Sequence, residues 1–330
     1  MKSKIKWGIL STAAIATEHV IPAIMNSEFG DVHAVASRSY DKAKNAADRF
    51  SIPKCYGSYE DLLMDEEIDA IYNPLPNHLH VPWTIKCLEA GKHVLVEKPI
   101  GLSSKEAETL IEESLKYPNL KIMEAFMYRH HPQWIKAKEL VESGVIGNVK
   151  TIQSFFAYFE DNPNSITNSK EYGGGSLMDI GCYPISLSRF IYNSEPQKVL
   201  ANIDYHPDYG VDISTTAIMK FKDGTSSFFS SIQVEDRQQA QIFGTKGKIE
   251  FQIPFNPIAN IQSKMYLHLN NKTEEIIFDP CDQYTIQADL FAQAIIEDTD
   301  VPTPLEDAVA NMNVIEKIIE SDKLGKQVNL

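Results

Sequence analysis

The chain has 330 residues, more than one hydrophobic core normally fills, so its length predicts two domains. Apolar residues make up 43% and charged residues 23%, as in ordinary globular proteins, which excludes disordered, collagen-like and disulfide-scaffold classes. With 31 Lys and Arg against 45 Asp and Glu, the formal net charge is −14. A negative field of this size repels nucleic acid and anionic membrane surfaces, so we expect neither as a partner.

The N-terminus resembles a secretory signal, because Lys2, Lys4 and Lys6 precede an apolar stretch. Residues 5–10 read equally well as a buried strand, however, and no apolar run reaches the length of a membrane span. The cysteines are Cys55, Cys87, Cys182 and Cys281. They have no zinc-site spacing and are too sparse for a disulfide framework. We therefore expect reduced thiols, a cytoplasmic protein and no bound metal.

Short apolar runs alternate with helical patterns over the first 124 residues. The predicted strands are residues 5–10, 32–36, 68–72, 94–96 and 121–123, and the predicted helices are residues 18–27, 41–50, 80–90 and 103–116. Apolar strands that are each followed by a helix indicate a parallel sheet covered on both faces. We expect an α/β fold, with a Rossmann-type, doubly wound dinucleotide-binding domain at residues 1–124.

The pattern changes after Pro132, where strand candidates replace the regular alternation. One predicted helix ends at residue 143, and others cover residues 175–192, 283–297 and 305–321. Apolar residues alternate with polar or small ones from 213 to 221, which predicts a strand, and Asp223-Gly224 predicts a two-residue hairpin turn. A further turn is predicted at 244–247, before a strand at 248–253. This predicts an α+β domain at residues 125–330 with a mainly antiparallel open sheet, serving substrate binding and oligomerisation. The closing helices are also suited to pack back on the first domain.

Residues that follow the parallel strands are the first candidates for a ligand site, because ligands bind at the carboxyl ends of such strands. After the first strand, Ser11, Ala13 and Ala16 stand at the three glycine positions of a dinucleotide fingerprint. They are small but tolerate positive φ less well than glycine. Without the surrounding βαβ pattern, an ordinary turn would be the simpler reading. The cofactor-contact candidates here are Ser11, Thr12, Ala13, Ala14 and Ile15.

The second strand is followed by Ser37 and Arg38 where an acidic residue usually binds the ribose of NAD. A guanidinium suits the 2′-phosphate of NADP, and Lys42 adds a second cation one turn into the next helix. A solvated surface arginine is the alternative. We favour NADP, with NAD as the less favoured cofactor.

Two further groups of residues suggest chemistry. Lys98 follows a predicted strand and projects toward the same edge of the sheet, where a partly desolvated pocket would lower its pKa and let it assist proton transfer. A surface lysine is the alternative. After three glycines at 173–175, Asp179 and Tyr183 are four residues apart and share one helix face, where they can bind a polyol and exchange its hydroxyl proton. The alternative is a helix-start aspartate and a packed tyrosine.

Together, these motifs resemble the Gfo/Idh/MocA oxidoreductase family, named after glucose-fructose oxidoreductase and inositol dehydrogenase. Glu97-Lys98-Pro99 is similar to its EKP motif, residues 74–80 to its proline-asparagine-histidine loop, and residues 174–181 to its GG-x-L-x-D-x-G helix. Ser37-Arg38 and Tyr183 resemble the branch of dimeric dihydrodiol dehydrogenases and NADP-dependent xylose dehydrogenases. The missing fingerprint glycines depart from the commoner family pattern.

The resemblance implies that Lys98 is the catalytic lysine, Asp179 a substrate-binding carboxylate and Tyr183 the proton-transfer residue. It extends the cofactor-binding set to Pro74, Leu75, Asn77, His80, Glu97, Lys98 and Arg129. We expect an NADP-dependent oxidoreductase acting on a hydroxyl or carbonyl carbon of a sugar, polyol or vicinal diol, assembled as a dimer or tetramer through the second domain's sheet. The alternatives are a non-catalytic dinucleotide-sensing regulator of the same fold and a sugar-binding module without cofactor.

Overall fold

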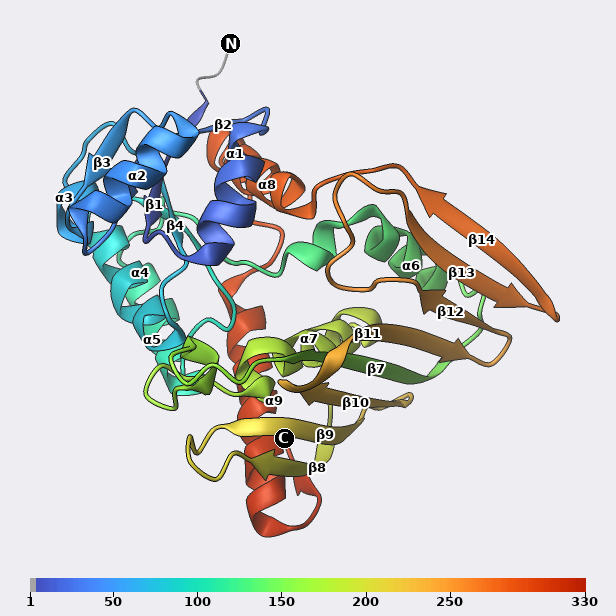
Figure 1. Cartoon of the computed structure of the whole chain (residues 1–330). Coiled ribbons are helices and arrows are strands. Elements are labelled where there is room, and N and C mark those ends of the chain that lie inside the picture. The colour runs from blue at the N-terminus through green and yellow to red at the C-terminus, as the bar shows by residue number, and fades with distance from the viewer. Residues whose placement is uncertain (1–3) are drawn as a thin grey trace. The chain divides into compact units, whose positions relative to one another are not determined.

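The computed structural model describes residues 4–330, and the chain folds into two compact units (Figure 1). The first unit is Met1–Met127 with Asp282–Val309, and the second is Tyr128–Cys281 with Ala310–Leu330. The segment Asp282–Val309 therefore belongs with the N-terminal part of the chain. Lys2, part of the signal-like pattern, lies outside the described residues. Within residues 4–330, no helix is both long and apolar enough to cross a membrane.

A six-stranded parallel sheet forms the centre of the first unit. Its strands, in spatial order, are β3 (Lys54–Tyr56), β2 (Gly30–Ala36), β1 (Ile5–Leu10), β4 (Ala70–Asn73), β5 (His93–Val96) and β6 (Ile122–Glu124). This 3-2-1-4-5-6 order is that of the doubly wound dinucleotide-binding fold, and it confirms the predicted fold class. The strand order reverses between β1 and β4, and ligands bind such sheets at this switch point.

Helices connect these strands. They are α1 (Ile21–Met25), α2 (Tyr40–Phe50), α3 (Tyr59–Leu63), α4 (His80–Glu89) and α5 (Ser104–Ser114). The first helical segment begins at Ala14, four residues before the predicted start, and includes a π-helical stretch, η1 (Ala16–Val20). A short 3₁₀ turn, η2 (Asn77–Leu79), precedes α4.

Helix α8 (Gln283–Glu297) completes the core of the first unit, beside α1 in Figure 1. The fully buried rings of Trp7 and Phe291 lie 5.6 Å apart. At the helix start, the Thr285 hydroxyl donates a hydrogen bond to the Ala23 carbonyl at 3.1 Å. The predicted helix at 283–297 is confirmed to the residue, and it packs against the first sheet's covering layer.

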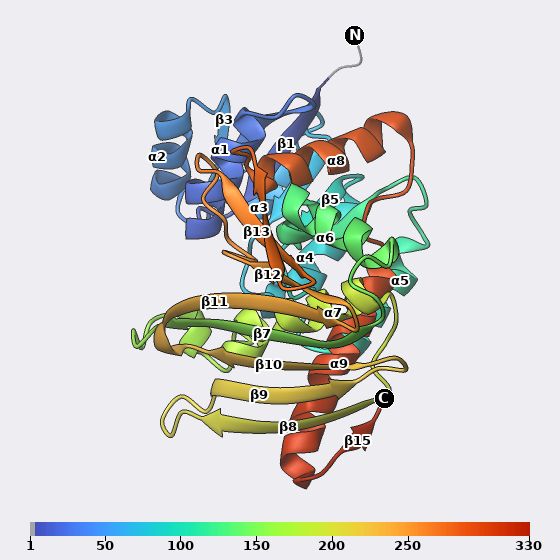
Figure 2. The ribbon, with the colours of Figure 1, turned by 90° about the vertical axis from the view of Figure 1, so that its right-hand side faces the viewer.

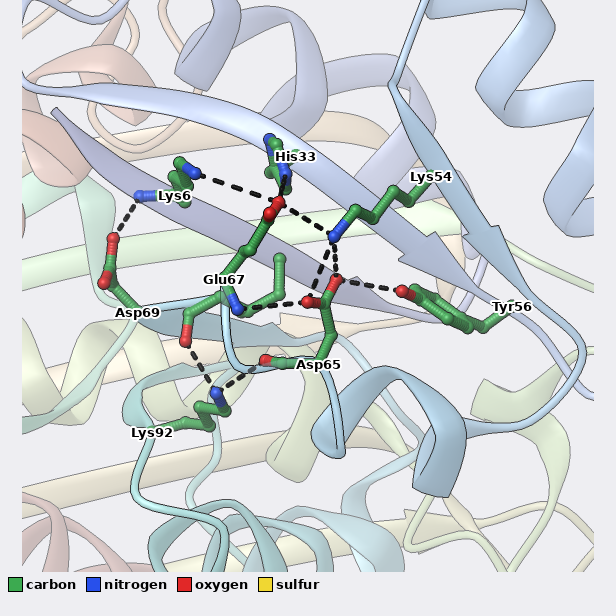
Figure 3. Close-up of polar contacts among 9 residues, drawn as sticks. Lys6, His33, Lys54, Tyr56, Asp65, Glu67, Asp69 and Lys92 are labelled. Atoms are coloured by element: carbon green, nitrogen blue, oxygen red, sulfur yellow. Dashed lines mark hydrogen bonds and ion pairs between the residues drawn. The ribbon is translucent and has the colours of Figure 1, made fainter.

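A network of charged side chains ties the loop before β4 to the amino ends of the parallel strands (Figure 3). Lys54 donates to Asp65 Oδ2 at 2.9 Å and to Glu67 Oε2 at 2.8 Å. Tyr56 also donates to Asp65 (2.9 Å), and His33 Nε2 lies 2.9 Å from Glu67 Oε2. The network lies at the end of the strands opposite to the one where ligands bind.

The second unit contains a nine-stranded sheet. Its order is β14 (Lys272–Phe278), β13 (Ser263–Leu269), β12 (Gly247–Phe251), β11 (Gln233–Gly244), β7 (Val149–Phe159), β10 (Thr225–Ser231), β9 (Asp212–Lys220), β8 (Lys198–Tyr205) and β15 (Val328–Asn329). Figure 2 shows β11, β7, β10, β9 and β8 following one another across it. Only β7 and β10 pair in parallel, so the sheet is mainly antiparallel, as predicted.

The loop between β9 and β10 differs from the prediction. The strands end at Lys220 and resume at Thr225, and the Phe221 N–H donates to the Gly224 carbonyl at 2.9 Å. The two-residue turn is therefore Lys222-Asp223, one residue before the predicted Asp223-Gly224. Phe221, beside this turn, is fully buried, and its ring stacks on Tyr192 at 4.4 Å.

The remaining helices of the second unit are η3 (Met127–His130), α6 (Pro132–Glu142), η4 (Ile166–Asn168), η5 (Leu177–Gly181), α7 (Cys182–Tyr192) and the later part of α9 (Leu305–Leu324). Helix α7 covers one face of the sheet through small side chains, since the hydroxyls of Ser188 and Ser226 lie 2.6 Å apart. The opposite face carries the stacked rings of Phe155 and Phe229, 4.9 Å apart. One face thus meets α7 through serine hydroxyls, whereas the other carries aromatic rings.

Candidate functional site

The turn after β1 has the backbone shape that a dinucleotide fingerprint requires. Ser11 adopts a φ of 89°, in the region where glycine is preferred, and its N–H donates to the Ala36 carbonyl at 2.9 Å. Ala13 is half-buried and Ala16 is fully buried. Serine thus takes the glycine conformation, and the small residues let the chain turn directly from strand to helix. The turn also places helix-start N–H groups at the switch point, an arrangement that suits a pyrophosphate.

The end of β2 leads into α2 through Ser37 and Arg38. Ser37 is buried, and its hydroxyl accepts the N–H of Ser39 at 3.3 Å. Arg38 and Lys42 are exposed. The structure therefore places both cations beside the start of α2, one turn apart, where a phosphate would find two positive partners.

Side chains of Asn73 and His80 contact backbone groups of the loops after β4 and β5. Asn73 Nδ2 donates to the His80 carbonyl at 3.1 Å, and its Oδ1 accepts the N–H of Leu75 at 3.3 Å. His80 is buried, with Nδ1 2.7 Å from the Pro99 carbonyl oxygen and Nε2 2.6 Å from that of Leu75. Burial lowers the pKa of His80 to about 4. His80 thus lies between the two loops, where the neutral ring has one N–H to donate to one of these two carbonyl oxygens. Pro74 is buried and Asn77 is half-buried on the same loop.

Lys98 lies directly after β5 and is half-buried. The preceding Glu97 is 8% exposed and accepts a hydrogen bond from Tyr72 at 2.6 Å. One residue beyond the motif, the N–H of Ile100 donates to Glu124 Oε1 at 2.7 Å. Buried carboxylates therefore brace the chain on both sides of Lys98.

In the second unit, Asp179 and Tyr183 lie on one continuous helix of residues 176–192, formed by η5 and α7. Its first turn is π-helical, a local geometry that is frequent at functional sites. Asp179 is half-buried and Tyr183 is 5% exposed. The structure therefore keeps both candidates on one helix, within one turn of each other.

Aromatic rings surround Tyr183. Its ring centroid lies 5.7 Å from Tyr128, 5.5 Å from Phe156 and 5.4 Å from Phe255. These rings come from η3, β7 and the loop after β12, so sequence spacing gave no signal for them. A phenol in such surroundings has its ring fixed on several sides.

Tyr158 has no sequence signal that marks it as a site residue. From β7 its hydroxyl donates to Asp179 Oδ2, and it lies 3.4 Å from Thr167 Oγ1. Tyr158 and Asp179 are 21 residues apart and lie on different elements, so no local pattern in the sequence links them.

The glycines at 174 and 175 approach the protein's own chain. A Cβ on Gly174 would lie 2.2 Å from the Thr167 carbonyl oxygen, and one on Gly175 would lie 2.0 Å from Asp212 Oδ1. At these two positions, close packing within the protein itself accounts for the glycines.

Arg129 belongs to the second unit and is 8% exposed. Its Nε and Nη2 donate to Ser186 Oγ at 3.0 and 2.8 Å, and the Ser186 and Tyr128 hydroxyls lie 2.7 Å apart. The guanidinium therefore anchors η3 to α7. Among residues 4–330, no cluster of three or more His, Cys, Asp and Glu side chains is arranged to hold a metal ion.

Comparison with known proteins gives matches over both units. Residues 5–124 match the oxidoreductase family with an NAD-binding Rossmann fold, and residues 134–250 match the GFO/IDH/MocA C-terminal domain. D-xylose 1-dehydrogenase (NADP(+)) 2 of Haloferax volcanii is 35% identical over 98% of this chain and 99% of its own. Trans-1,2-dihydrobenzene-1,2-diol dehydrogenase of Xenopus tropicalis is 37% identical over 74% of each chain.

One solved structure has a similar fold over nearly the full length of this chain. The crystal structure of KijD10, a 3-ketoreductase from Actinomadura kijaniata in complex with NADP and TDP-benzene, has a TM-score of 0.91. It is 28% identical in sequence and covers 97% of this chain and 98% of its own.

Proposed function

Because the chain belongs to the GFO/IDH/MocA family of oxidoreductases, we propose that it transfers a hydride between NADP and a CH–OH or carbonyl carbon of a sugar, polyol or vicinal diol. The observation that carries this is the helix on which Asp179 and Tyr183 lie one turn apart among aromatic rings. The named activities of the relatives support the substrate class, since they act on xylose and on a dihydrodiol.

The first unit fits a dinucleotide. The strand order, the positive φ of Ser11 and the helix that starts at Ala14 are the features that a bound pyrophosphate needs. When bound, NADP supplies the hydride acceptor or donor at its nicotinamide ring. The residues that would hold it are Ser11, Thr12, Ala13, Ala14, Ile15, Ser37, Arg38, Lys42, Pro74, Leu75, Asn77, Glu97, Lys98 and Arg129, with His80 between the loops after β4 and β5.

NADP rather than NAD is favoured by two observations. Arg38 and Lys42 offer two exposed cations beside the start of α2, where no carboxylate replaces Ser37. The xylose dehydrogenase relative is named for NADP, and the 3-ketoreductase structure contains it.

We assign one role to each of three side chains. In the oxidation direction, Tyr183 accepts the proton of the substrate hydroxyl, while the ammonium of Lys98 favours the tyrosinate electrostatically. Asp179 accepts a hydrogen bond from a substrate hydroxyl and so orients the polyol. In the reduction direction, Tyr183 returns its proton to the carbonyl oxygen.

The test is the Tyr183→Phe variant, which keeps the packed ring and removes the exchangeable proton. Turnover should fall about a hundredfold or more, while NADPH affinity measured by fluorescence stays at the wild-type value. Lys98→Ala should lose turnover as well. The matched control is Tyr192→Phe on the same helix, whose hydroxyl donates to the Thr225 carbonyl at 2.8 Å. If Tyr183→Phe and Lys98→Ala both remain within a few fold of wild type on the best sugar or diol, the assignment is wrong.

A further inference from the structure

A buried carboxylate from another strand stands at the start of the Asp179 helix. Asp212, the first residue of β9, is 9% exposed. Its Oδ2 accepts the Ser176 hydroxyl at 2.7 Å, the Leu177 N–H at 2.7 Å and the Thr215 hydroxyl at 3.2 Å. Ser176 and Thr215 are both fully buried. Asp212 therefore satisfies polar groups that water does not reach.

Asp212 takes the place of an N-terminal cap, because the residue just before the helix has no side chain that could accept a hydrogen bond. A helix start leaves several N–H groups without partners, and a side-chain oxygen just before the first turn usually accepts one of them. Here that position is Gly175, whose φ of 109° is outside the helical range and which has no side chain. Asp212 supplies the missing acceptor from β9, and its negative charge interacts favourably with the helix dipole.

Gly175 and Asp212 also fit each other sterically. A Cβ at Gly175 would lie 2.0 Å from Asp212 Oδ1, which is closer than any van der Waals contact allows. The glycine therefore gives the carboxylate room to reach the helix start.

We propose that ionised Asp212 is a positioning residue for the active site: it fixes the first turn of the helix that carries Asp179 and Tyr183. The inference rests on the proposed function for the roles of those two residues. Asp179 lies three residues after Ser176, so a shift of the first turn moves its carboxylate directly. Displacements of about 1 Å in such groups are enough to cost up to a hundredfold in rate.

The arrangement also predicts how activity depends on pH. Burial raises the pKa of Asp212, although the hydrogen bonds from Ser176, Leu177 and Thr215 oppose this effect. The facing titratable side chain is Tyr205, its partner across β8 and β9. When Asp212 is protonated, its O–H is itself a hydrogen-bond donor, so the carboxyl group can no longer accept all three hydrogen bonds. Activity should therefore decline toward acid at a pH above the usual aspartate pKa of about 4.

The first experiment uses Asp212→Asn in the full-length protein. We expect turnover on the best sugar or diol to fall between about tenfold and a hundredfold, with NADPH affinity unchanged. Amide hydrogen exchange at residues 176–183 should speed up, and the acid decline of the remaining activity should disappear. The matched control is Asp204→Asn, an exposed aspartate on β8 that accepts the Ser214 hydroxyl at 2.9 Å, and it should change none of these readouts.

A milder variant covers the case in which Asp212→Asn does not fold. Thr215→Val removes one of the three donors while keeping the side-chain shape. The ionised carboxylate then loses a hydrogen bond, so the acid decline should move to higher pH. Wild-type exchange at residues 176–183 in Asp212→Asn, or an unmoved acid decline in Thr215→Val, would overturn the proposal. The exchange measurement needs no turnover, so this failure is distinguishable from an active Tyr183→Phe, which would overturn the proposed function instead.

Discussion

Arg38 is the residue on which the cofactor preference depends. It is exposed beside the start of α2, and Lys42 lies one turn further on. A guanidinium bonded to a 2′-phosphate makes charge-assisted hydrogen bonds worth roughly 1.5–3 kcal/mol each, or about tenfold or more in affinity.

We therefore predict that NADPH binds about tenfold or more tightly than NADH, and that Arg38→Ala removes most of this difference. Fluorescence titration with both cofactors measures it directly. Arg49→Ala, at the far end of α2, serves as the control and should leave the ratio unchanged. A wild-type protein that binds both cofactors equally would contradict the assignment of NADP.

The catalytic candidates illustrate how far single residues can be inferred from sequence. Lys98, Asp179 and Tyr183 belong to contiguous motifs, so the family they indicate could be identified, and the comparisons confirm it. Tyr158 and Asp212 could not be found this way, because each contacts the Asp179 helix through a tertiary hydrogen bond and belongs to no local sequence pattern. Their roles become visible only when β7 and β9 are placed beside that helix.

At the scale of elements, the sequence predicts clearly patterned segments best, whereas the long strands β7 and β11 were not predicted as strands. Strand β1 and helix α8 have the predicted bounds. Strand β3 was missed because its three residues, Lys54–Tyr56, are too short to show a period, and the five residues of α3 (Tyr59–Leu63) make little more than one turn. The π-helical stretches were missed because their hydrogen-bond pattern has no sequence signature of its own.

The charged network of Lys54, Asp65 and Glu67 should make the first unit sensitive to acid. Hydrogen bonds from Lys54 and His33 lower the pKa of Glu67 to about 2. Burial opposes ionisation of Asp65, but hydrogen bonds from Lys54, the Glu67 N–H and Tyr56 outweigh it and lower its pKa to about 2. Because both folded-state pKa values lie below the unfolded ones, the stabilisation is complete above about pH 4.5 and is lost as the pH falls toward 2.

We predict that Lys54→Met lowers the melting temperature at pH 7 by a few degrees, and that this deficit shrinks as the pH falls from about 4.5 toward 2. Thermal unfolding followed by circular dichroism across this range is the measurement. Lys44→Met is the control, because Lys44 pairs with Asp48 on the surface of α2, where both side chains are about half exposed or more. A deficit that stays constant down to pH 2 would show that Lys54 stabilises the unit by something other than these carboxylates.

At the scale of the whole molecule, the uncovered face of the second unit's sheet bears on assembly. Phe155 and Phe229 stack on this face, and Ile218 and Leu200 are 49% and 41% exposed. Opposite them, α7 already covers the other face. An apolar group of this kind on an open sheet is typical of an interface, so we propose a twofold dimer through this sheet, with a tetramer as the larger alternative.

Light scattering at micromolar concentration should therefore give at least twice the 37.2 kDa mass of one chain. Ile218→Lys places a charge in the proposed interface and should shift the mass toward that of the monomer. Met64→Lys, at an 80% exposed position of the first unit, should not. A wild-type mass of one chain would mean that this face stays open in solution.

The division of the chain has a consequence for how the protein is made. Phe291 packs on Trp7, and Asp289 accepts the Ser27 hydroxyl, although nearly the whole chain separates these partners. During synthesis, the strands of the N-terminal sheet leave the ribosome first, but their unit is incomplete until α8 has been made. The intervening residues Tyr128–Cys281, which belong to the other unit, are made in between. A nascent chain that stops before residue 282 would hold Trp7 without its aromatic cover, and a fragment ending at 124 would share that defect permanently. The second unit is completed later still, by Ala310–Leu330, so neither unit can finish folding until most of the chain has been synthesised.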